Sequence, residues 1–183
     1  MKRFWGKSRT MSSSLEMIQA QRVEYFLQVL SWVSDRFGLN QPPIVNLDDL
    51  RSLAPDSLGY AWAEHLDANG LQPFDQGMRR QQLHDGLHVL TGYGIDPIGE
   101  AEVQAFLLGA KFRLVHILLL GGTVMGINRR HRHQLIVLSP GELRARLRAA
   151  YDRGRNSLLD PDTWRPEILW EQSLADVQGA FGL

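Results

Sequence analysis

The stretch HDGLHVLTGYGIDPIGE, residues 84–100, holds the end of one helix, a glycine-rich turn and the start of another. The preceding helix is expected to begin near Asp75, and Thr91-Gly92-Tyr93-Gly94 breaks it. Asp96 followed by Pro97 predicts an N-cap with proline at the first helical position. Because the connection is short, the two helices are predicted to pack as a tight hairpin.

This hairpin gathers histidines and carboxylates. His84 and His88 are four residues apart, so both imidazoles project from one face of a helix, with Asp85 at the edge of that face. The hairpin returns Glu100 towards them. Two imidazoles with one or two carboxylates favour a divalent metal site, with zinc as the first choice and iron(II) or magnesium as alternatives. A solvated face or a satisfied core pair is the plainer interpretation of a histidine pair at this spacing.

The remainder of the chain also shows mainly helical periodicity. Helices are predicted over residues 14–37 and 48–52. A third is predicted through LGYAWAEHLDANG and stops at Gly70. A further helix is predicted from Pro97 to about Leu120, where Gly121 and Gly122 end or bend it. QLIVL is predicted to be a short strand or buried linker. Ser139 and Glu142 form a capping box that opens a helix to about Arg153, and EILWEQSLADVQGAF is predicted to be the last helix.

These elements predict an all-α fold. We expect one helical domain over residues 15–183, a helical bundle with an apolar lipid tunnel, preceded by a basic, flexible arm over residues 1–14. The apolar stripe of the helix from Pro97 is interpreted either as a tunnel wall or as plain core. Its members are Val103, Phe106, Leu107, Ala110, Leu114, Ile117 and Leu118.

Composition excludes several classes of function. The 183 residues include 20 Lys plus Arg and 20 Asp plus Glu, so no overall field favours nucleic acid. The absence of cysteine excludes disulfides, thiolate metal ligands and a thiol nucleophile. The longest apolar region, LVHILLLGGTVMGI, is too short and too interrupted to span a bilayer, so we expect no membrane crossing.

The run HDGLHVLTGYGIDPIGEAEVQAF resembles the signature of the coenzyme Q (ubiquinone) biosynthesis protein four family, the fourth of the COQ proteins. The family pattern is His-Asp-x-x-His, then eleven residues, then Glu, and His84, Asp85, His88 and Glu100 match it. Weaker similarity covers LGYAWAEHLDANGLQP and RPEILWEQSLADVQGAFG. The resemblance implies an all-helical fold and a divalent metal, usually taken as zinc, held by the motif.

The resemblance also implies a function. Members are peripheral membrane proteins that handle polyprenylated quinone precursors. They are associated with replacement of the ring carbon 1 carboxyl of a prenylated hydroxybenzoate by hydroxyl, an oxidative decarboxylation, and with organising other quinone-biosynthesis enzymes. The expected location is the cytoplasmic side of a bacterial inner membrane, or the matrix side of the mitochondrial inner membrane in a eukaryote. The short chain favours the bacterial case.

The residues are compatible with this chemistry. A cation on the hairpin could bind a ring carboxylate and the adjacent phenolic oxygen as Lewis acid and template. Asp85 could be a ligand, could orient a histidine or could move a proton. Two rival functions remain, a non-catalytic lipid-binding scaffold and a metal-dependent hydrolase. The hydrolase is disfavoured because Asp85 is one methylene shorter than the glutamate of metalloprotease motifs.

Other residues have a functional and a structural interpretation. Arg79 and Arg80 lie about one turn before His84, where a guanidinium could bind a substrate carboxylate or form a surface salt bridge. Tyr93 is either a substrate contact or a packing aromatic. The basic run NRRHRH could contact lipid phosphates or be solvated. Expected partners are an isoprenoid precursor, a membrane surface, other quinone-biosynthesis enzymes and a second copy of the chain. His65 and His116 are interpreted as structural.

Overall fold

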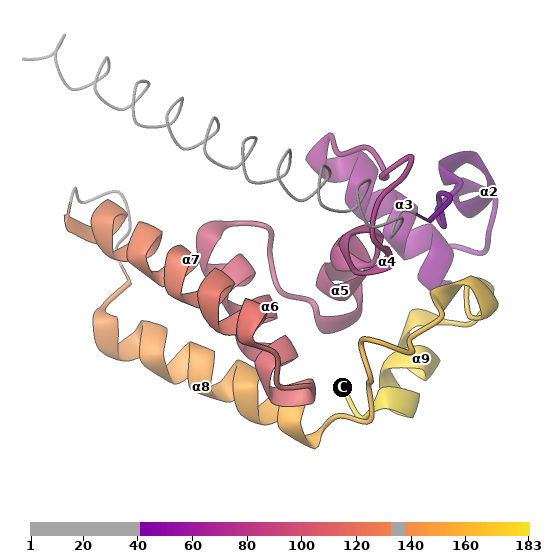
Figure 1. Ribbon diagram of the computed structural model, residues 1–183. Helices are drawn as coiled ribbons and strands as arrows, with labels where there is room; N and C mark the ends of the chain where they lie inside the picture. The colour runs from indigo at the N-terminus through magenta and orange to yellow at the C-terminus, as the bar shows by residue number, and fades with distance from the viewer. Residues whose placement is uncertain (1–40, 133–137) are drawn as a thin grey trace, which may run out of the picture. The chain divides into compact units, whose positions relative to one another are not determined.

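The computed structural model describes residues 41–132 and 138–183. These residues form helices and no strand, which confirms the all-α prediction (Figure 1). The helices are α2 (Leu47–Arg51), α3 (Leu58–Asn69), α4 (Arg79–Gln82), α5 (His84–Thr91), α6 (Pro97–Ala110), α7 (Leu114–Arg132), α8 (Pro140–Asn156), a 3-10 turn (Pro166–Ile168) and α9 (Leu174–Phe181). The arm at 1–14, the helix at 14–37 and nearly all of QLIVL lie outside the described residues.

The chain divides into two compact units. The larger comprises residues 43–74 and 80–183, and the smaller includes residues 41–42 and 75–79. In the smaller unit an isolated bridge pairs Gln41 with Gly77. The helical packing below belongs to the larger unit.

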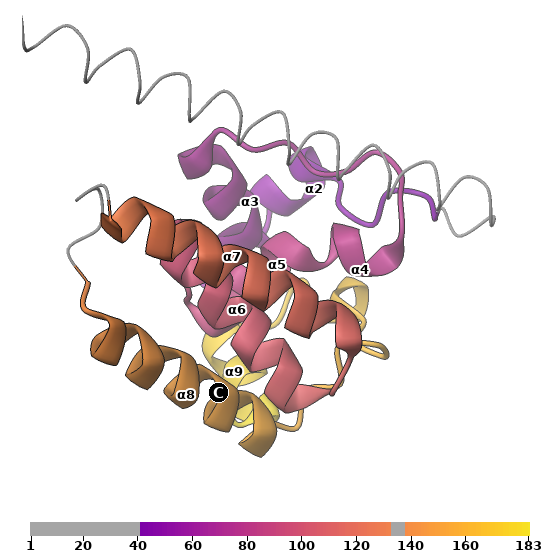
Figure 2. The same cartoon turned by 60° about the vertical axis from the view of Figure 1, so that its left-hand side comes forward.

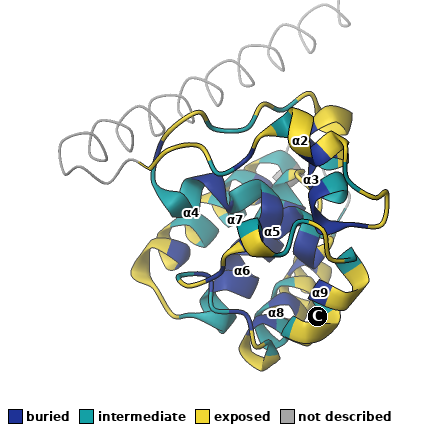
Figure 3. Cartoon of the chain, turned by 90° about the vertical axis from the view of Figure 1, so that its right-hand side faces the viewer, coloured by how far each residue is buried: buried dark blue, intermediate teal, exposed yellow. Residues whose placement is uncertain are grey.

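Helix α6 is central to the packing of the larger unit. It contacts α7 on one side and α8 on another (Figures 1 and 2), and residues 101–107 are all buried (Figure 3). The buried carboxylate of Glu102 accepts hydrogen bonds from Nε and Nη2 of Arg146, each at 2.8 Å, and so fastens α6 to α8. Such two-pronged arginine–carboxylate pairs fix orientation as well as distance.

Two apolar clusters differ in size. The larger joins α3, α5, α6 and α9 and centres on Trp62, whose ring stacks on Trp164 at 6.0 Å and meets Trp170 edge-on at 5.1 Å. The smaller has only Ala101, Ile127 and Leu143 as its buried members. The larger cluster therefore supplies most of the apolar burial.

The predicted helix caps are confirmed. Gly70 ends α3 with φ of 62°, a left-handed conformation that glycine adopts without strain. The side chain of Asp96 accepts a hydrogen bond from the backbone N–H of Ile98 at 2.8 Å, with Pro97 in the first turn of α6. Ser139 and Glu142 form the reciprocal capping box at the start of α8.

Several predicted helix boundaries are wrong. The helix expected from Asp75 begins only at Arg79, because Gly77 has φ of 132°, and it is divided into α4 and α5 at Leu83. The capping-box helix continues past Arg153 to Asn156. The last predicted helix is a 3-10 turn followed by α9, which begins only after the Ser173 N-cap.

The long helix predicted from Pro97 to Leu120 is two helices. It ends at Ala110 because Lys111 is extended, with φ of −153°, and its ammonium group pairs with Asp160 at 2.7 Å. Gly121 lies inside α7 with Gly122 beside it and does not end that helix. Within residues 41–132 and 138–183, no helix combines the length and apolar character that a membrane crossing requires.

Candidate metal centre

The hairpin predicted from the sequence forms between α5 and α6. Gly92 ends α5 with φ of 75°. A Cβ on Gly99 would overlap the carbonyl of Gly94, so glycine at this position lets the first turn of α6 lie directly against the turn. The carbonyls that end α5 are held from elsewhere, because Thr91 O accepts from Arg153 Nη1 at 2.6 Å. These contacts fix the two helix ends that carry the site.

The hairpin brings three of the predicted residues together. His84 Nε2 lies 3.2 Å from Glu100 Oε2 and 3.3 Å from His88 Nε2. His88 Nε2 lies 3.3 Å from Glu100 Oε1. One ligand atom from each residue falls within 4.8 Å of the others, so the three form a group that could hold a metal ion. The side chain of His88 is buried, whereas those of His84 and Glu100 are about one-third exposed, at 32% and 35%.

The turn between α5 and α6 determines which nitrogen of His88 carries the hydrogen and which one presents a lone pair to the cluster. His88 Nδ1 lies 3.0 Å from the backbone oxygen of Tyr93. A carbonyl only accepts, so Nδ1 carries the hydrogen, and in the neutral ring Nε2 has a lone pair. That lone pair faces the Glu100 carboxylate and the His84 ring. A lone pair facing a carboxylate is repulsive unless a positive charge lies between them, and either a proton on Nε2 or a bound metal ion supplies it.

The electrostatics of the pair agree with this requirement. Burial lowers the pKa of His88, but the hydrogen bond and charge of Glu100 outweigh it and leave that pKa raised. Burial would likewise raise the pKa of Glu100, but hydrogen bonds from His84 and His88 lower it to about 2. Glu100 is therefore an anion at neutral pH, and it stabilises positive charge beside the imidazoles.

Asp85 lies beside this group but is not one of its three members. Burial raises the pKa of its carboxyl group, while the charges of His84, His65 and His88 act in the opposite direction. The structure thus places Asp85 in the electrostatic field of three imidazoles. Its role as ligand, positioning group or proton carrier stays a prediction.

His65 was missed as a neighbour of the site. It comes from α3, and its ring stacks on that of His88 with centroids 6.0 Å apart and planes 12° apart. Its Nε2 atom is buried and has no hydrogen-bond partner among the described residues. Burial and then His88 lower the pKa of His65. The sequence signal was its position three residues after Trp62, which places both on one helix face.

The other predicted contacts are placed as follows. Arg80 Nε donates to Asp162 Oδ1 at 2.9 Å, and Arg80 Nη1 lies 3.2 Å from His116 Nε2. The ring of Tyr93 packs edge-on against Phe106 and lies under the Arg153 guanidinium at 5.5 Å. Arg79 belongs to the smaller unit. Binding of substrate by Arg79, Arg80 and Tyr93 stays a prediction.

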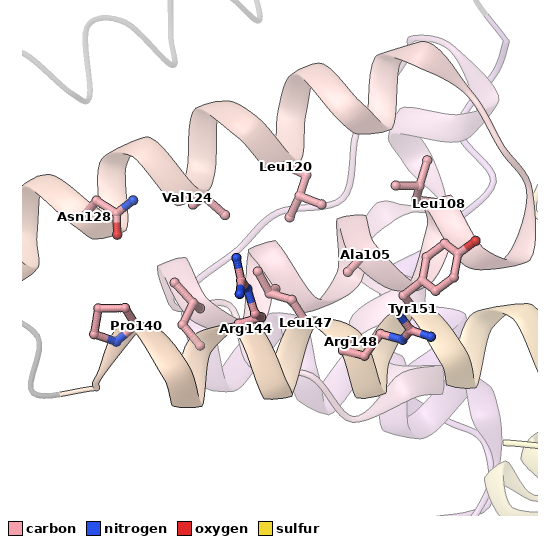
Figure 4. A pocket seen from close by; sticks show the side chains of 11 residues that line it. Ala105, Leu108, Leu120, Val124, Asn128, Pro140, Arg144, Leu147, Arg148 and Tyr151 are labelled. Carbon is pink, nitrogen blue, oxygen red and sulfur yellow. The ribbon is translucent and has the colours of Figure 1, made fainter.

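An apolar groove lies between α7 and α8, with α6 as its floor (Figure 4). Its volume is about 450 Å³, and its lining includes Leu120 and Val124 of α7, Leu147 and Tyr151 of α8, and Ala105 of α6. None of the seven residues predicted as a tunnel wall is among the residues that line this groove.

The residues predicted as that wall are divided between core and surface. Val103, Phe106 and Leu107 are buried in the larger cluster, whereas Leu114 and Leu118 are exposed on α7. The helix break at Lys111 separates the two groups.

Fold and site together define an all-α protein with a candidate divalent-metal centre in a helical hairpin. A mitochondrial ubiquinone biosynthesis protein COQ4 homolog of Leishmania braziliensis is 32% identical over 85 residues, covering 37% of this chain and 46% of the relative. The matched region thus spans less than half the length of that relative.

The fold has a counterpart among solved structures. A crystal structure of a Nostoc punctiforme protein, provisionally assigned to ubiquinone biosynthesis, has a TM-score of 0.63 at 22% identity. The similarity covers 77% of this chain and 69% of the other. No family model matches the chain. The chain is thus similar to the COQ4 homolog in the sequence of one part, and to the Nostoc punctiforme protein in fold.

Proposed function

We propose that this chain is a ubiquinone biosynthesis protein in which His84, His88 and Glu100 bind a divalent metal, with zinc as the first choice. Its substrate is a polyprenylated hydroxybenzoate, and its reaction replaces the ring carbon 1 carboxyl by hydroxyl. The observation that carries the proposal is the convergence of two imidazole nitrogens and a carboxylate on one point. The similarity to the COQ4 homolog supports the pathway.

The spacing of the donor atoms fits a shared ion. Zinc binds imidazole nitrogen and carboxylate oxygen at roughly 2.1 Å, so two ligands of one tetrahedral ion lie about 3.4 Å apart. The 3.3 Å between the Nε2 atoms of His84 and His88 matches that edge. Each nitrogen also has one oxygen of Glu100 near it, Oε2 at 3.2 Å from His84 and Oε1 at 3.3 Å from His88. Three protein ligands leave one position for water or substrate. Iron(II) suits the same two histidines and one carboxylate.

The residues around the ion have separate tasks. When bound, a divalent ion supplies Lewis-acid chemistry for a carboxylate and a neighbouring oxygen. The Tyr93 carbonyl holds His88 in the tautomer that presents Nε2, and Glu100 remains anionic beside it. Asp85 is a half-buried carboxyl group next to these side chains, where it can hold or return a proton. The carboxyl group leaves as CO2 and a hydroxyl oxygen is attached to ring carbon 1, which is a two-electron oxidation of the substrate. The oxidant, such as dioxygen, and the new oxygen atom therefore come from outside the chain.

The groove between α7 and α8 supports binding of the prenyl chain. Its lining is largely aliphatic, and the guanidinium groups of Arg144 and Arg148 come from the same stretch of α8 (Figure 4). Apolar walls with a few polar groups are typical of sites for amphiphilic ligands. Because such precursors dissolve in bilayers, the protein would work at a membrane surface, peripheral to the inner membrane and beside other quinone-biosynthesis enzymes.

A non-catalytic lipid-binding scaffold is the second candidate. The observation in its favour is that the groove is lined by residues other than His84, His88 and Glu100. Lipid binding there would not require an open metal position. In this alternative the metal only fastens the α5–α6 hairpin.

Elemental analysis of the purified protein tests the metal centre. We expect one equivalent of zinc or iron in the wild type, and loss of at least nine-tenths of it in His84→Ala and in Glu100→Gln, as roughly expected when a ligand is removed. Glu64→Gln, which changes an exposed carboxylate on α3, is the matched control and should keep its metal. Equal metal in all four proteins, or none after zinc is added back, would contradict the proposal.

Turnover then separates the two functions. With a prenylated hydroxybenzoate and a supplied oxidant, we expect product from the wild type and from Glu64→Gln only. Full turnover by metal-free Glu100→Gln would exclude the catalytic version. Retention of co-purified polyprenyl lipid by every variant, with no turnover by any, would favour the scaffold.

A further inference from the structure

The outward face of α7 is apolar. Leu114, Leu118 and Met125 are 71%, 74% and 58% exposed. Their spacing of four and seven residues places them on one stripe of the helix, about 16 Å long at 1.5 Å per residue. Phe112, which is 68% exposed, lies just before the helix begins. We call these four residues the α7 outer face.

The opposite side of α7 is apolar as well. His116 and Ile127 are buried, and Leu120 packs against the smaller cluster. A surface helix normally has one apolar stripe and a polar face towards water. Helix α7 therefore has a second apolar stripe, which its packing against the other described residues, 41–132 and 138–183, does not use. Contiguous exposed apolar side chains of this kind mark a surface that something else covers.

The charges near α7 indicate what covers it. No acidic residue occurs between Glu102 and Glu142, whereas Lys111 and Arg113 precede the helix and Arg129 lies in its last turn. Arg129 is exposed. The outer face is thus an apolar stripe with cationic residues towards both of its ends.

The first of these ends retains a positive charge after its ion pairs are counted. Lys111 bonds Asp160 at 2.7 Å and Asp162 at 3.0 Å, Arg80 bonds Asp162 at 2.8 Å, and Arg113 also bonds Asp162. Three cations thus share two carboxylates. The surface offers a net positive charge to a partner of opposite sign.

We propose that the α7 outer face docks on an anionic lipid bilayer, with Phe112, Leu114, Leu118 and Met125 inserted at the boundary of headgroups and acyl chains. Interfacial helices bind by apolar burial together with attraction of basic residues to anionic lipid. This inference deepens the proposed function by naming its membrane-facing surface. It rests on the exposure and charge of α7 and not on the metal centre.

A second copy of the chain is a less suitable occupant. In a two-fold pair of α7 helices the same surface meets itself, so each basic helix end approaches another basic end or an apolar stripe. With no acidic residue between 102 and 142, neither copy supplies a countercharge from this segment. An anionic bilayer supplies it along the whole helix.

Docking at this face would also place the groove between α7 and α8 close to the membrane. Leu120 and Val124 of the same helix line the groove between α7 and α8 (Figure 4). A bilayer against the outer face of α7 would therefore lie one helix width from the groove. A prenyl chain could pass between membrane and protein with little exposure to water.

Vesicle flotation tests the proposal without metal or precursor. We expect the wild type to bind phosphatidylcholine vesicles that contain phosphatidylglycerol. The double variant Leu118→Gln/Met125→Gln should bind them with an affinity lower by about tenfold or more. The matched control is Leu158→Gln/Ile168→Gln, which alters side chains that are 77% and 69% exposed elsewhere. Arg129→Gln should weaken binding only when phosphatidylglycerol is present. No wild-type binding, or equal weakening by both double variants, would overturn the proposal.

Site-specific fluorescence provides a second measurement that does not depend on a loss of binding. The chain has no cysteine, so Leu118→Cys and Leu158→Cys can each carry one polarity-sensitive dye. We expect a blue shift with the anionic vesicles at position 118 and none at position 158. A blue shift at 118 without lipid that disappears on dilution, together with a dimer in sedimentation, would show self-association and overturn the proposal.

Discussion

The α3–α5–α9 region and the α7–α8 region bury their apolar residues to very different extents. In the first, Leu58, Trp62, Leu66, Leu90 and Val177 are all at most 1% exposed. In the second, α7 exposes Leu114, Val115, Ile117, Leu118 and Met125. Among the described residues of α3, α5 and α9, no large apolar side chain is exposed to that degree.

This difference indicates a division of work within one chain. His84 and His88, two members of the group that could hold a metal ion, lie on the closely packed region, which suits a centre whose donor atoms must hold fixed distances. The α7–α8 region contains a groove instead, and a face of α7 that the other described residues leave exposed. Under the membrane proposal, the burial of these apolar residues is completed by lipid.

The largest expected effect is on the packed core. Trp62→Ala should lower the free energy of unfolding by about 3–5 kcal/mol, because it removes a buried ring that contacts two other tryptophans. Ile127→Ala, in the smaller cluster, should lower it by about 2 kcal/mol, the low end for such a change. Urea denaturation followed by circular dichroism measures both. Equal losses would remove the distinction between the two regions.

The next effect is on pH dependence and concerns the buried side of α7. His116 Nδ1 lies 2.9 Å from Gln104 Oε1, and burial, followed by the charge of Arg80, lowers the pKa of His116 from 6.5 to about 4. The unfolded chain therefore binds a proton at a higher pH than the folded chain. Stability due to the neutral ring is complete above pH 6.5 and is lost as pH falls through 4.

This loss should be on the order of 3 kcal/mol, at 1.36 kcal/mol per pKa unit. His116→Gln should show a correspondingly shallower fall in unfolding free energy between pH 7 and pH 4. Denaturant titrations of the wild type and of His116→Gln at several pH values measure the difference between their unfolding free energies. The contributions of other titrating groups cancel in this difference. Parallel pH profiles would show that folding does not lower the pKa of His116.

The smallest effects have opposite signs in the two regions. A Cβ on Gly86 would overlap the Trp62 ring, whereas a Cβ on Gly122 would meet no atom within 4 Å. Gly86→Ala should destabilise the protein by about 1–3 kcal/mol through overpacking. Gly122→Ala should stabilise it by up to about 1 kcal/mol, the difference in helix propensity. Thermal unfolding of the two variants gives both signs, and destabilisation by Gly122→Ala would indicate a close neighbour on α7.

Local chemistry explains what could be predicted from the sequence. Caps such as Asp96 before Pro97 and Ser139 with Glu142 act within one turn, so the residues that form them are adjacent in the chain. The His84, His88 and Glu100 cluster was predictable for the same reason, because a short turn joins its two helices. The metal ion itself and the role of Asp85 stay predictions.

Long-range contacts explain what could not be predicted. The break at Lys111 depends on Asp160, which lies far along the chain. Gly109 of α6 allows the close approach of α8, because a Cβ there would overlap the backbone of Tyr151. His65 joins the site only through the packing of α3 against α5. In each case the partner comes from another part of the chain, and helical periodicity carries no information about it.

The bond between His88 Nδ1 and the carbonyl of Tyr93 has a consequence for how this protein can vary. The acceptor is a main-chain atom, so no exchange of the side chain at position 93 removes it. Insertion or deletion of a single residue between Gly92 and Gly94 would displace it, even though every ligand is retained. Substitution at position 93 is therefore tolerated by this bond where a change in the length of the turn is not, and homologues should agree in spacing here even where the residue at 93 differs.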